Sequence, residues 1–119
     1  MTVSKAKGAK AKADKLFSQL VRSRGVCERC GERSDVVTAH ILGRRFSATR
    51  TDERNAWALD PTCHYVVDNW PDEKMHLVEE TIGLEVYAEL RAKAESTVRR
   101  FDWPAEVERL KGLLAAVNA

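Results

Sequence analysis

The sequence has few cysteines, few aromatic residues and no long apolar run. Three cysteines among 119 residues, an odd number, argue against a disulfide framework and for a reduced compartment, where such cysteines more often bind a metal ion. No apolar stretch approaches the roughly 20 residues of a membrane-spanning helix. The Lys- and Ala-rich start lacks the apolar segment of a signal peptide. These absences predict a soluble, cytoplasmic protein with no membrane partner.

The chain is short enough for one domain with a small core, so a structural metal ion would help it to fold. Its charge is unevenly distributed. Residues 1–50 contain 12 Lys and Arg against 4 Asp and Glu, a net charge of +8, whereas residues 51–119 contain 8 against 14, a net charge of −6. A phosphate-binding half would explain this asymmetry, and so would a basic tail beside ordinary solvated faces.

The pattern of apolar residues divides the chain. Residues 1–13 contain four lysines and almost no large apolar side chain, which predicts a flexible basic arm that touches DNA without sequence preference. Residues 14–119 are expected to form the single domain. Its first helix should begin at Asp14, as a possible N-cap, and end near Gly25.

Strands and further helices follow in a recognisable order. β-Branched residues predict a strand over 36–42, an arginine-rich loop over 43–52 and a returning strand over 56–59. Asp60 and Pro61 have the residue types of a helix N-cap and first turn. Helices are then expected over about 72–81, 84–100 and 104–117. Trp70, Tyr87, Phe101 and Trp103 are expected to pack in the core or between helices.

Four short motifs occur in sequence order: Cys27-Glu28-Arg29-Cys30, then Ala39-His40-Ile41, then Asn55, then Cys63-His64. Together with the segments TAHILGRR and TRTDERNAWALDPTCH, and more loosely NWP, VEETIG and LRAKA, they make roughly residues 21–103 resemble the phage-type HNH endonucleases. These are ββα-metal (His-Me finger) nucleases with a zinc knuckle. The resemblance implies an α+β fold with a ββα-metal core at about 27–70 and a helical C-terminal cover at about 71–117.

The resemblance also implies an activity and a set of catalytic residues. The activity is metal-dependent hydrolysis of DNA phosphodiester bonds, by nicking or by double-strand cleavage. His40 would be the general base, since its ordinary pKa of about 6.5 lets it accept a proton near neutral pH. Asn55 would hold the loop between the strands, and His64 would bind a catalytic Mg²⁺- or Mn²⁺-like ion. Asp68 lies one helical turn after His64, where its carboxylate could reach the same ion.

The chain departs from the family pattern at two positions. Many members have a metal-binding Asp or His directly before the general base, but this chain has Ala39. Where the usual second C-x-x-C begins, it has Asp60, so the zinc ligands would be Cys27, Cys30, Asp60 and Cys63. A carboxylate can bind Zn²⁺. Alternatively, water or His76 completes the zinc site, or Asp60 is only the helix cap and zinc is weakly bound or absent.

The arginine-rich loop completes the sequence-based hypothesis. Guanidinium groups match the geometry of phosphates, so Arg44, Arg45, Arg50 and Arg54 are candidate DNA-binding residues, with a solvated loop as the alternative. DNA is the expected partner, and proteins of phage packaging or recombination could be others. An alternative function is a catalytically inactive zinc-knuckle module that binds DNA or serves as an accessory subunit. Ala39 favours that alternative, whereas His40, Asn55 and His64 oppose it.

Overall fold

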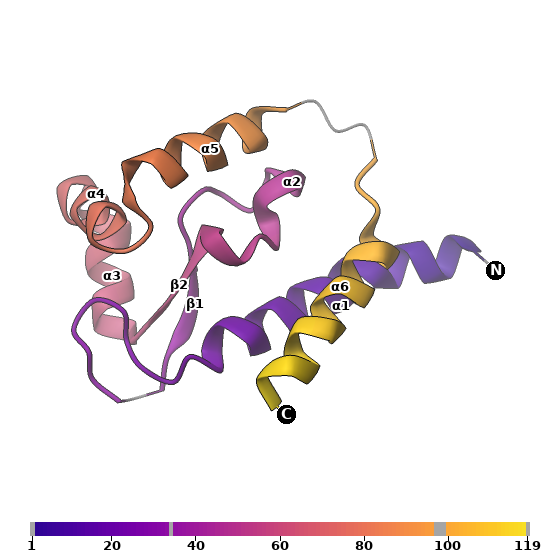
Figure 1. The fold of residues 1–119 in the computed structure, drawn as a ribbon, viewed down its shortest axis with the longest axis horizontal. Coiled ribbons are helices and arrows are strands. Elements are labelled where there is room, and N and C mark those ends of the chain that lie inside the picture. Colours follow the sequence, from indigo (N-terminus) through magenta and orange to yellow (C-terminus); the bar gives the residue numbers. More distant parts are fainter. Residues whose placement is uncertain (1, 34, 97–99, 119) are drawn as a thin grey trace.

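The computed structural model describes residues 2–33, 35–96 and 100–118. Within these residues, an α+β fold combines six α-helices with one two-stranded antiparallel sheet (Figure 1). The elements are α1 (Thr2–Arg22), β1 (Val37–His40), α2 (Ser47–Arg50), the 3-10 turn η1 (Glu53–Asn55), β2 (Ala56–Leu59), α3 (Pro61–Asn69), α4 (Pro71–Glu80), α5 (Gly83–Glu95) and α6 (Trp103–Asn118). In the part of the chain that the structure describes, no helix is both long enough and apolar enough to cross a membrane.

The small sheet lies at the centre of the molecule. Val37 of β1 is opposite Leu59 of β2, and His40 is opposite Ala56. All four residues of β2 are buried, because α1 and α3 both pack against the sheet. Trp57, rather than any of the four aromatics expected in the core, is the largest fully buried side chain. The returning strand over 56–59 is therefore confirmed, and the first strand is shorter than expected.

Helix α3 begins where the sequence predicts. The Asp60 carboxylate accepts a hydrogen bond from the backbone N–H of Cys63 at 2.7 Å, and Pro61 occupies the first helical position. An N-cap of this kind satisfies one of the free N–H groups at the helix start. Because β2 runs directly into this capped helix, the residues of the first turn of α3 have a fixed place beside the sheet.

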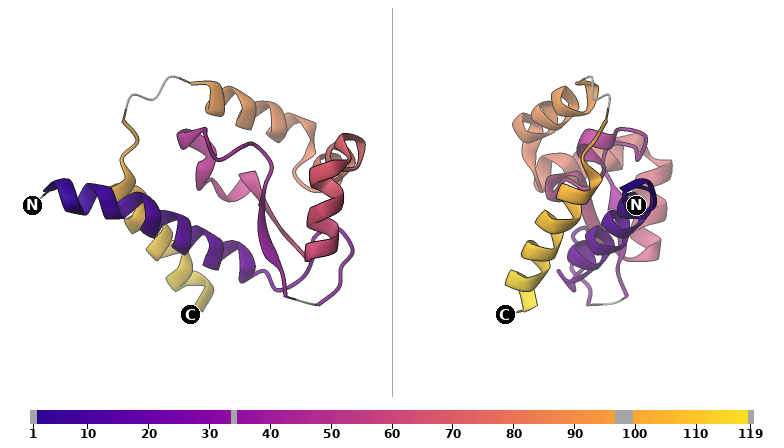
Figure 2. Two further views of the ribbon diagram at one scale, coloured as in Figure 1. Left: turned by 180° about the vertical axis from the view of Figure 1, so that it is seen from behind. Right: turned by 90° about the vertical axis from the view of Figure 1, so that its right-hand side faces the viewer.

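The expectation of a flexible arm over residues 1–13 is wrong for the described residues, because α1 extends back to Thr2. Ala9 and Ala13 are buried, and α1 packs closely against α6 (Figures 1 and 2). Alanine has the highest intrinsic helix propensity, and its small side chain lets two helices approach closely. Asp14 is consequently a mid-helix residue and not an N-cap.

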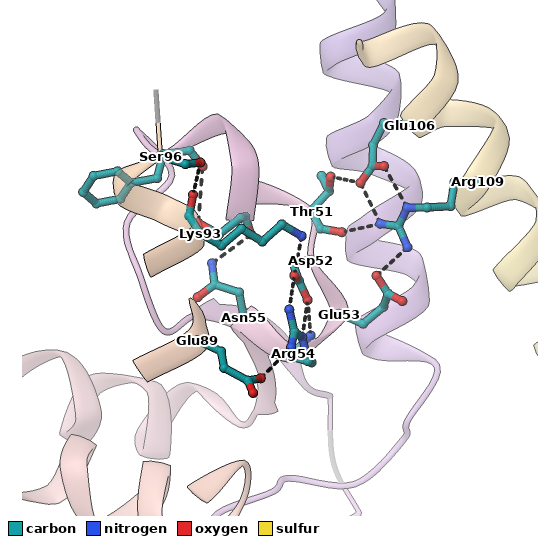
Figure 3. A network of polar contacts seen from close by, with 12 residues as sticks. Thr51, Asp52, Glu53, Arg54, Asn55, Glu89, Lys93, Ser96, Glu106 and Arg109 are labelled. Atoms are coloured by element: carbon teal, nitrogen blue, oxygen red, sulfur yellow. Dashed lines mark hydrogen bonds and ion pairs between the residues drawn. The ribbon is translucent and has the colours of Figure 1, made fainter. Parts of the chain in front are cut away.

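The segment before β2 is fixed by charged side chains from two C-terminal helices (Figure 3). Lys93 of α5 lies 2.8 Å from the carboxylate of Asp52, which also binds Arg54 at 3.0 Å. Arg109 of α6 donates to the backbone carbonyl of Thr51 at 2.9 Å and pairs with Glu53 at 2.7 Å. The predicted loop over 43–52 thus contains a short helix and is held from both α5 and α6.

The C-terminal helices agree with the expected cover, with changed limits. Helix α5 ends at Glu95, and residues 97–99 of the expected helix lie outside the described residues. Tyr87 and Trp103 pack against the core, and the rings of Phe101 and Trp103 are 4.4 Å apart. Trp70 is different: half of its surface is exposed and its ring meets the edge of Tyr65. Of the two expected positions for Trp70, packing in the core is therefore wrong, and the residue lies at the junction between α3 and α4.

Candidate metal centre and catalytic cleft

Three cysteines and one aspartate from two distant segments meet beside the end of β2. Cys27 and Cys30 come from the turn after α1, and Asp60 and Cys63 come from the start of α3. One potential ligand atom from each residue lies within 4.8 Å of all the others. Three thiol sulfurs and a carboxylate oxygen suit four-coordinate Zn²⁺, so this group could hold a metal ion such as zinc.

The position of Asp60 fits both roles that the sequence left open, helix cap and fourth metal ligand. One carboxylate oxygen caps α3, and the other accepts a hydrogen bond from the Cys30 thiol at 3.0 Å. His76, the alternative fourth ligand, lies on α4 with its Nε2 atom 2.6 Å from Glu80, and it is not part of the cysteine group. The geometry therefore favours Asp60 over His76 as the fourth member.

The hydrogen bond between Cys30 and Asp60 changes the acidity of both groups. It raises the pKa of the Cys30 thiol to about 12 and lowers the pKa of the Asp60 carboxyl to about 2. Zinc binds thiolates, so an entering ion would displace the proton that the Cys30 thiol donates to Asp60. The Arg29 guanidinium lies 3.5 Å from the Cys63 sulfur. There its positive charge would stabilise the negative charge of a Cys63 thiolate.

The turn that contains Cys27 and Cys30 is also held by hydrogen bonds. Gly31 has φ +80°, which favours glycine, and its N–H donates to the Cys27 carbonyl at 2.8 Å. The backbone N–H of Glu28 donates to the Ala58 carbonyl at 2.8 Å, and the Glu28 carboxylate accepts from the Ala58 N–H at 2.6 Å. These bonds attach the turn to β2 and place its sulfurs beside α3.

A separate cleft of about 570 Å³ lies between α1, β1 and α3. His40, His64 and Asp68 line it together with Arg44. Cys63, although it precedes His64, is buried on another side of α3. The structure therefore brings three of the predicted catalytic and metal-binding residues to one cleft and places the cysteine group elsewhere. The remaining lining residues are Asp14, Phe17, Ser18, Thr38 and Gly43.

His40 is held by its Nε2 atom, which lies 2.9 Å from the backbone carbonyl oxygen of Arg50. A carbonyl oxygen can only accept a hydrogen bond, so Nε2 carries the proton and a neutral ring has its free lone pair on Nδ1. Burial lowers the pKa of His40, and the nearby positive charges of Arg44 and Arg50 act in the same direction. The imidazole is thus neutral at pH 7 and able to accept a proton.

His64 and Asp68 lie one turn apart on the same face of α3. The Nε2 atom of His64 is 3.2 Å from an Asp68 carboxylate oxygen, and both side chains are partly exposed. An imidazole nitrogen and a carboxylate oxygen are donors that Mg²⁺- or Mn²⁺-like ions accept, although oxygen is preferred. The pair could contribute ligands from one rigid element.

Position 39 contributes nothing to this donor set. The Ala39 side chain is buried and lies opposite Trp57 in the sheet. Successive side chains of a strand point to opposite faces, so Ala39 faces the core while His40 reaches the cleft. A larger ligating side chain at this position would have to enter the core.

Asn55 does not line the cleft and is completely buried. Its side-chain oxygen accepts from the backbone N–H of Leu42 at 2.8 Å, and its amide group donates to the carbonyls of Leu42 at 3.2 Å and Thr49 at 3.0 Å. Three hydrogen bonds from one side chain therefore close the loop between β1 and α2. That loop carries Arg44, and the helix α2 that follows it ends at Arg50, whose carbonyl contacts His40.

Three of the four candidate DNA-binding arginines are exposed, and two of these, Arg44 and Arg45, have no carboxylate oxygen closer than 3.8 Å among the described residues. The Arg44 side chain lines the cleft and is 61% exposed, with a single long contact of 3.8 Å to Asp14. Arg45 is exposed as well and lies over the ring of Phe46, 4.6 Å from its centre. Both guanidinium groups can turn toward a phosphate.

The other two arginines are occupied by carboxylates. Arg50 is largely buried and binds Asp14 with two hydrogen bonds. Arg54 binds both carboxylate oxygens of Asp52 and lies 3.4 Å from Glu89. The structure therefore separates a cluster that looked uniform in sequence into two arginines without a close carboxylate partner, Arg44 and Arg45, and two with one, of which Arg54 is 44% exposed.

The cleft also contains Thr38 and residues of α1, which were not among the site residues expected from the sequence. Asp14, Phe17 and Ser18 line it from α1, and the Ser18 and Thr38 hydroxyls are 3.2 Å apart. Alternation along β1 places Thr38 on the same side as His40, so that residue could have been found. The side of α1 that meets the cleft has no comparable local signal.

Comparison of the chain with protein-family models, with curated proteins and with solved structures gives no match.

Proposed function

We propose that this protein is a divalent-metal-dependent endonuclease of the HNH type that hydrolyses phosphodiester bonds in DNA. The observation that carries the proposal is the cleft in which His40 from β1 meets His64 and Asp68 from α3. The order of β1, β2 and α3 supports a ββα-metal core, and the cysteine group supports an accompanying structural zinc site. A neutral base beside a potential metal-binding pair is the arrangement that metal-assisted hydrolysis requires.

In the proposed reaction, His40 acts as general base through Nδ1. A water oxygen forms a bond to phosphorus, and one water proton passes to Nδ1. The bond from phosphorus to the 3′ oxygen breaks with its electron pair on that oxygen, which then takes a proton from solvent water. The burial that lowers the pKa of His40 keeps the ring ready to accept that proton. The hydrogen bond from Nε2 to the Arg50 carbonyl fixes the direction of the ring.

His64 and Asp68 are the residues that would hold the catalytic cation. When bound, a Mg²⁺- or Mn²⁺-like ion would stabilise negative charge on the phosphate and the leaving oxygen. Arg44, exposed at the edge of the same cleft, would contact a phosphate of the DNA backbone. Asn55 would act through the loop that it closes and would not touch the DNA.

Plasmid cleavage in the presence of Mg²⁺ or Mn²⁺ tests this proposal. His40→Ala should reduce the single-turnover rate by about 10²–10⁴-fold, the usual contribution of a general base. His64→Ala should reduce both cleavage and calorimetrically measured cation binding. His76→Ala is the matched control, because His76 also pairs with an acidic residue four positions later but lies on α4, outside the cleft. Wild-type rates in a folded His40→Ala variant would remove His40 from the mechanism.

A second candidate is a DNA-binding module without nuclease activity. The inward position of Ala39 favours it, because the chain lacks a donor directly before His40. Under this alternative, the wild-type protein would bind DNA with strong salt dependence yet leave supercoiled plasmid intact with every divalent ion tested. The cleavage assay and a binding titration on the same preparation therefore separate the two functions.

A further inference from the structure

Asp14 of α1 forms a bidentate ion pair with Arg50 beside the cleft. The Arg50 Nε atom lies 2.8 Å from one carboxylate oxygen of Asp14, and Nη2 lies 2.7 Å from the other. Both side chains are mostly shielded, with 28% of Asp14 and 14% of Arg50 exposed. A planar guanidinium that binds both carboxylate oxygens is held in one orientation. A guanidinium with a single contact at the surface is free to rotate.

Arg50 connects this ion pair to the backbone around His40. Its own carbonyl oxygen accepts the hydrogen bond from His40 Nε2, and its Nη1 atom donates to the Arg44 carbonyl at 2.9 Å. The guanidinium group thus fixes both ends of the segment from 44 to 50. Asp14 is the only anchor of that guanidinium on α1 among the contacts of the described residues.

We propose that Asp14 is a positioning residue for His40: by holding Arg50, it keeps the Arg50 carbonyl at Nε2 and so selects the tautomer whose Nδ1 is free to accept a proton. The significance of this tautomer for catalysis rests on the proposed nuclease function. The positioning of His40 by Asp14 is independent of that function, because it concerns only the contacts from Asp14 of α1 through Arg50 of α2 to His40 of β1. It also assigns α1, which lies outside the ββα core, a part in the active site.

Nitrogen-resolved NMR of the imidazole ring tests the structural claim without DNA or added divalent cation. Above the pKa of His40, the wild-type protein should show the Nε2-protonated tautomer almost alone. In Asp14→Ala, the populations should shift toward those of the same histidine in the denatured chain. Asp14→Asn, which keeps one acceptor oxygen, should give an intermediate shift. An unchanged tautomer in folded Asp14→Ala would overturn the proposal.

Arg109→Ala provides the matched control for the loss of an ion pair near this loop. Arg109 joins α6 to Thr51 and Glu53, and none of the hydrogen bonds or ion pairs between the described residues joins it to His40. Its replacement should lower the melting temperature and leave the His40 tautomer unchanged. If Asp14→Ala does not fold, Arg50→Lys supplies the test, because lysine keeps the charge and the main chain but cannot bind both carboxylate oxygens. A wild-type tautomer in folded Arg50→Lys would equally overturn the proposal.

Cleavage and cation binding distinguish positioning from direct metal binding. A positioning role predicts that Asp14→Ala slows single-turnover cleavage by about 10²-fold, as a small misplacement of a reacting group does, with unchanged Mg²⁺ or Mn²⁺ affinity. A large loss of cation affinity with an unchanged tautomer would make Asp14 a metal ligand and contradict the proposal. If wild-type protein cleaves nothing, the proposed function fails, while the tautomer comparison still decides whether Asp14 positions His40.

Discussion

At the scale of single residues, Asn55 has the largest expected structural effect. Asn55→Ala removes three hydrogen bonds to the backbone and leaves two part-buried groups of Leu42, its N–H and its carbonyl, without that partner. The Thr49 carbonyl still accepts a hydrogen bond from the Asp52 N–H at 3.1 Å. Each group left unpaired costs about 1–3 kcal/mol, so we expect the free energy of unfolding to fall by roughly 2–5 kcal/mol. Urea denaturation measures this change.

Asn69→Ala is the matched control for Asn55. Asn69 also donates from its amide to a backbone carbonyl, that of Tyr65, but it is exposed at the end of α3. Its replacement should change the free energy of unfolding by less than about 0.5 kcal/mol. Equal losses in the two variants would contradict the view that burial gives Asn55 its importance.

The residue types and their spacing predict much of the candidate site, but they do not predict which charged side chains form ion pairs there. The short C-x-x-C turn already places Cys27 and Cys30 together, and helical geometry already separates Cys63 from His64. By contrast, the pairing of Arg50 with Asp14 joins residues 36 positions apart. No local pattern shows which of several nearby arginines meets a carboxylate, because that depends on how α1 packs.

At the scale of elements, α1 shows why a composition argument failed. Low apolar content correctly indicates little hydrophobic driving force over residues 1–13, but it overlooks Ala9 and Ala13, which pack at helical spacing.

We predict that Ala13→Gln destabilises the protein by about 1–3 kcal/mol, because a larger polar side chain would have to enter a closed interface. Ala11→Gln, at an exposed position of the same helix, should change stability little. Thermal unfolding compares the two, and equal melting temperatures would mean that this part of α1 is not packed in solution.

The attachment of α5 to the segment before β2 should depend on pH through Asp52. Burial opposes ionisation, but hydrogen bonds from Arg54 and Lys93 outweigh it and lower the pKa of Asp52 to about 2 from 3.8. A carboxyl with a lowered folded-state pKa stabilises the fold above its unfolded pKa, and this contribution disappears as pH falls from about 4 toward 2.

Asp52→Asn tests that contribution. The variant should be roughly 2 kcal/mol less stable than wild type at pH 7, and the difference should shrink as the pH is lowered toward 2. Denaturant unfolding across this range gives the measurement. Glu95→Gln, which affects an exposed pair with Arg91, is the control and should show almost no difference at any pH. A pH-independent loss in Asp52→Asn would point to packing and not to charge.

At the scale of the whole molecule, the two halves of the chain share the candidate site. The basic half supplies α1, β1 and the loop with Arg44, whereas the acidic half supplies α3. The fold class could be predicted because strand, loop, strand and helix follow directly in the sequence. The packing of α1 on α6 could not, because it joins opposite ends of the chain and depends on side-chain fit.

The cysteine group also joins distant parts of the molecule, since it links the turn after α1 to the start of α3. We predict one zinc ion per chain by elemental analysis and a clear fall in melting temperature after chelation, because zinc binding contributes directly to folding.

Asp60→Asn separates the two roles of Asp60. Asparagine keeps an oxygen for the Cys63 N–H and remains a good N-cap, but it lacks the carboxylate that would bind zinc. Zinc affinity should therefore fall, while the zinc-free variant should melt near zinc-free wild type. Unchanged zinc affinity would leave Asp60 as a helix cap alone and require a fourth ligand from elsewhere.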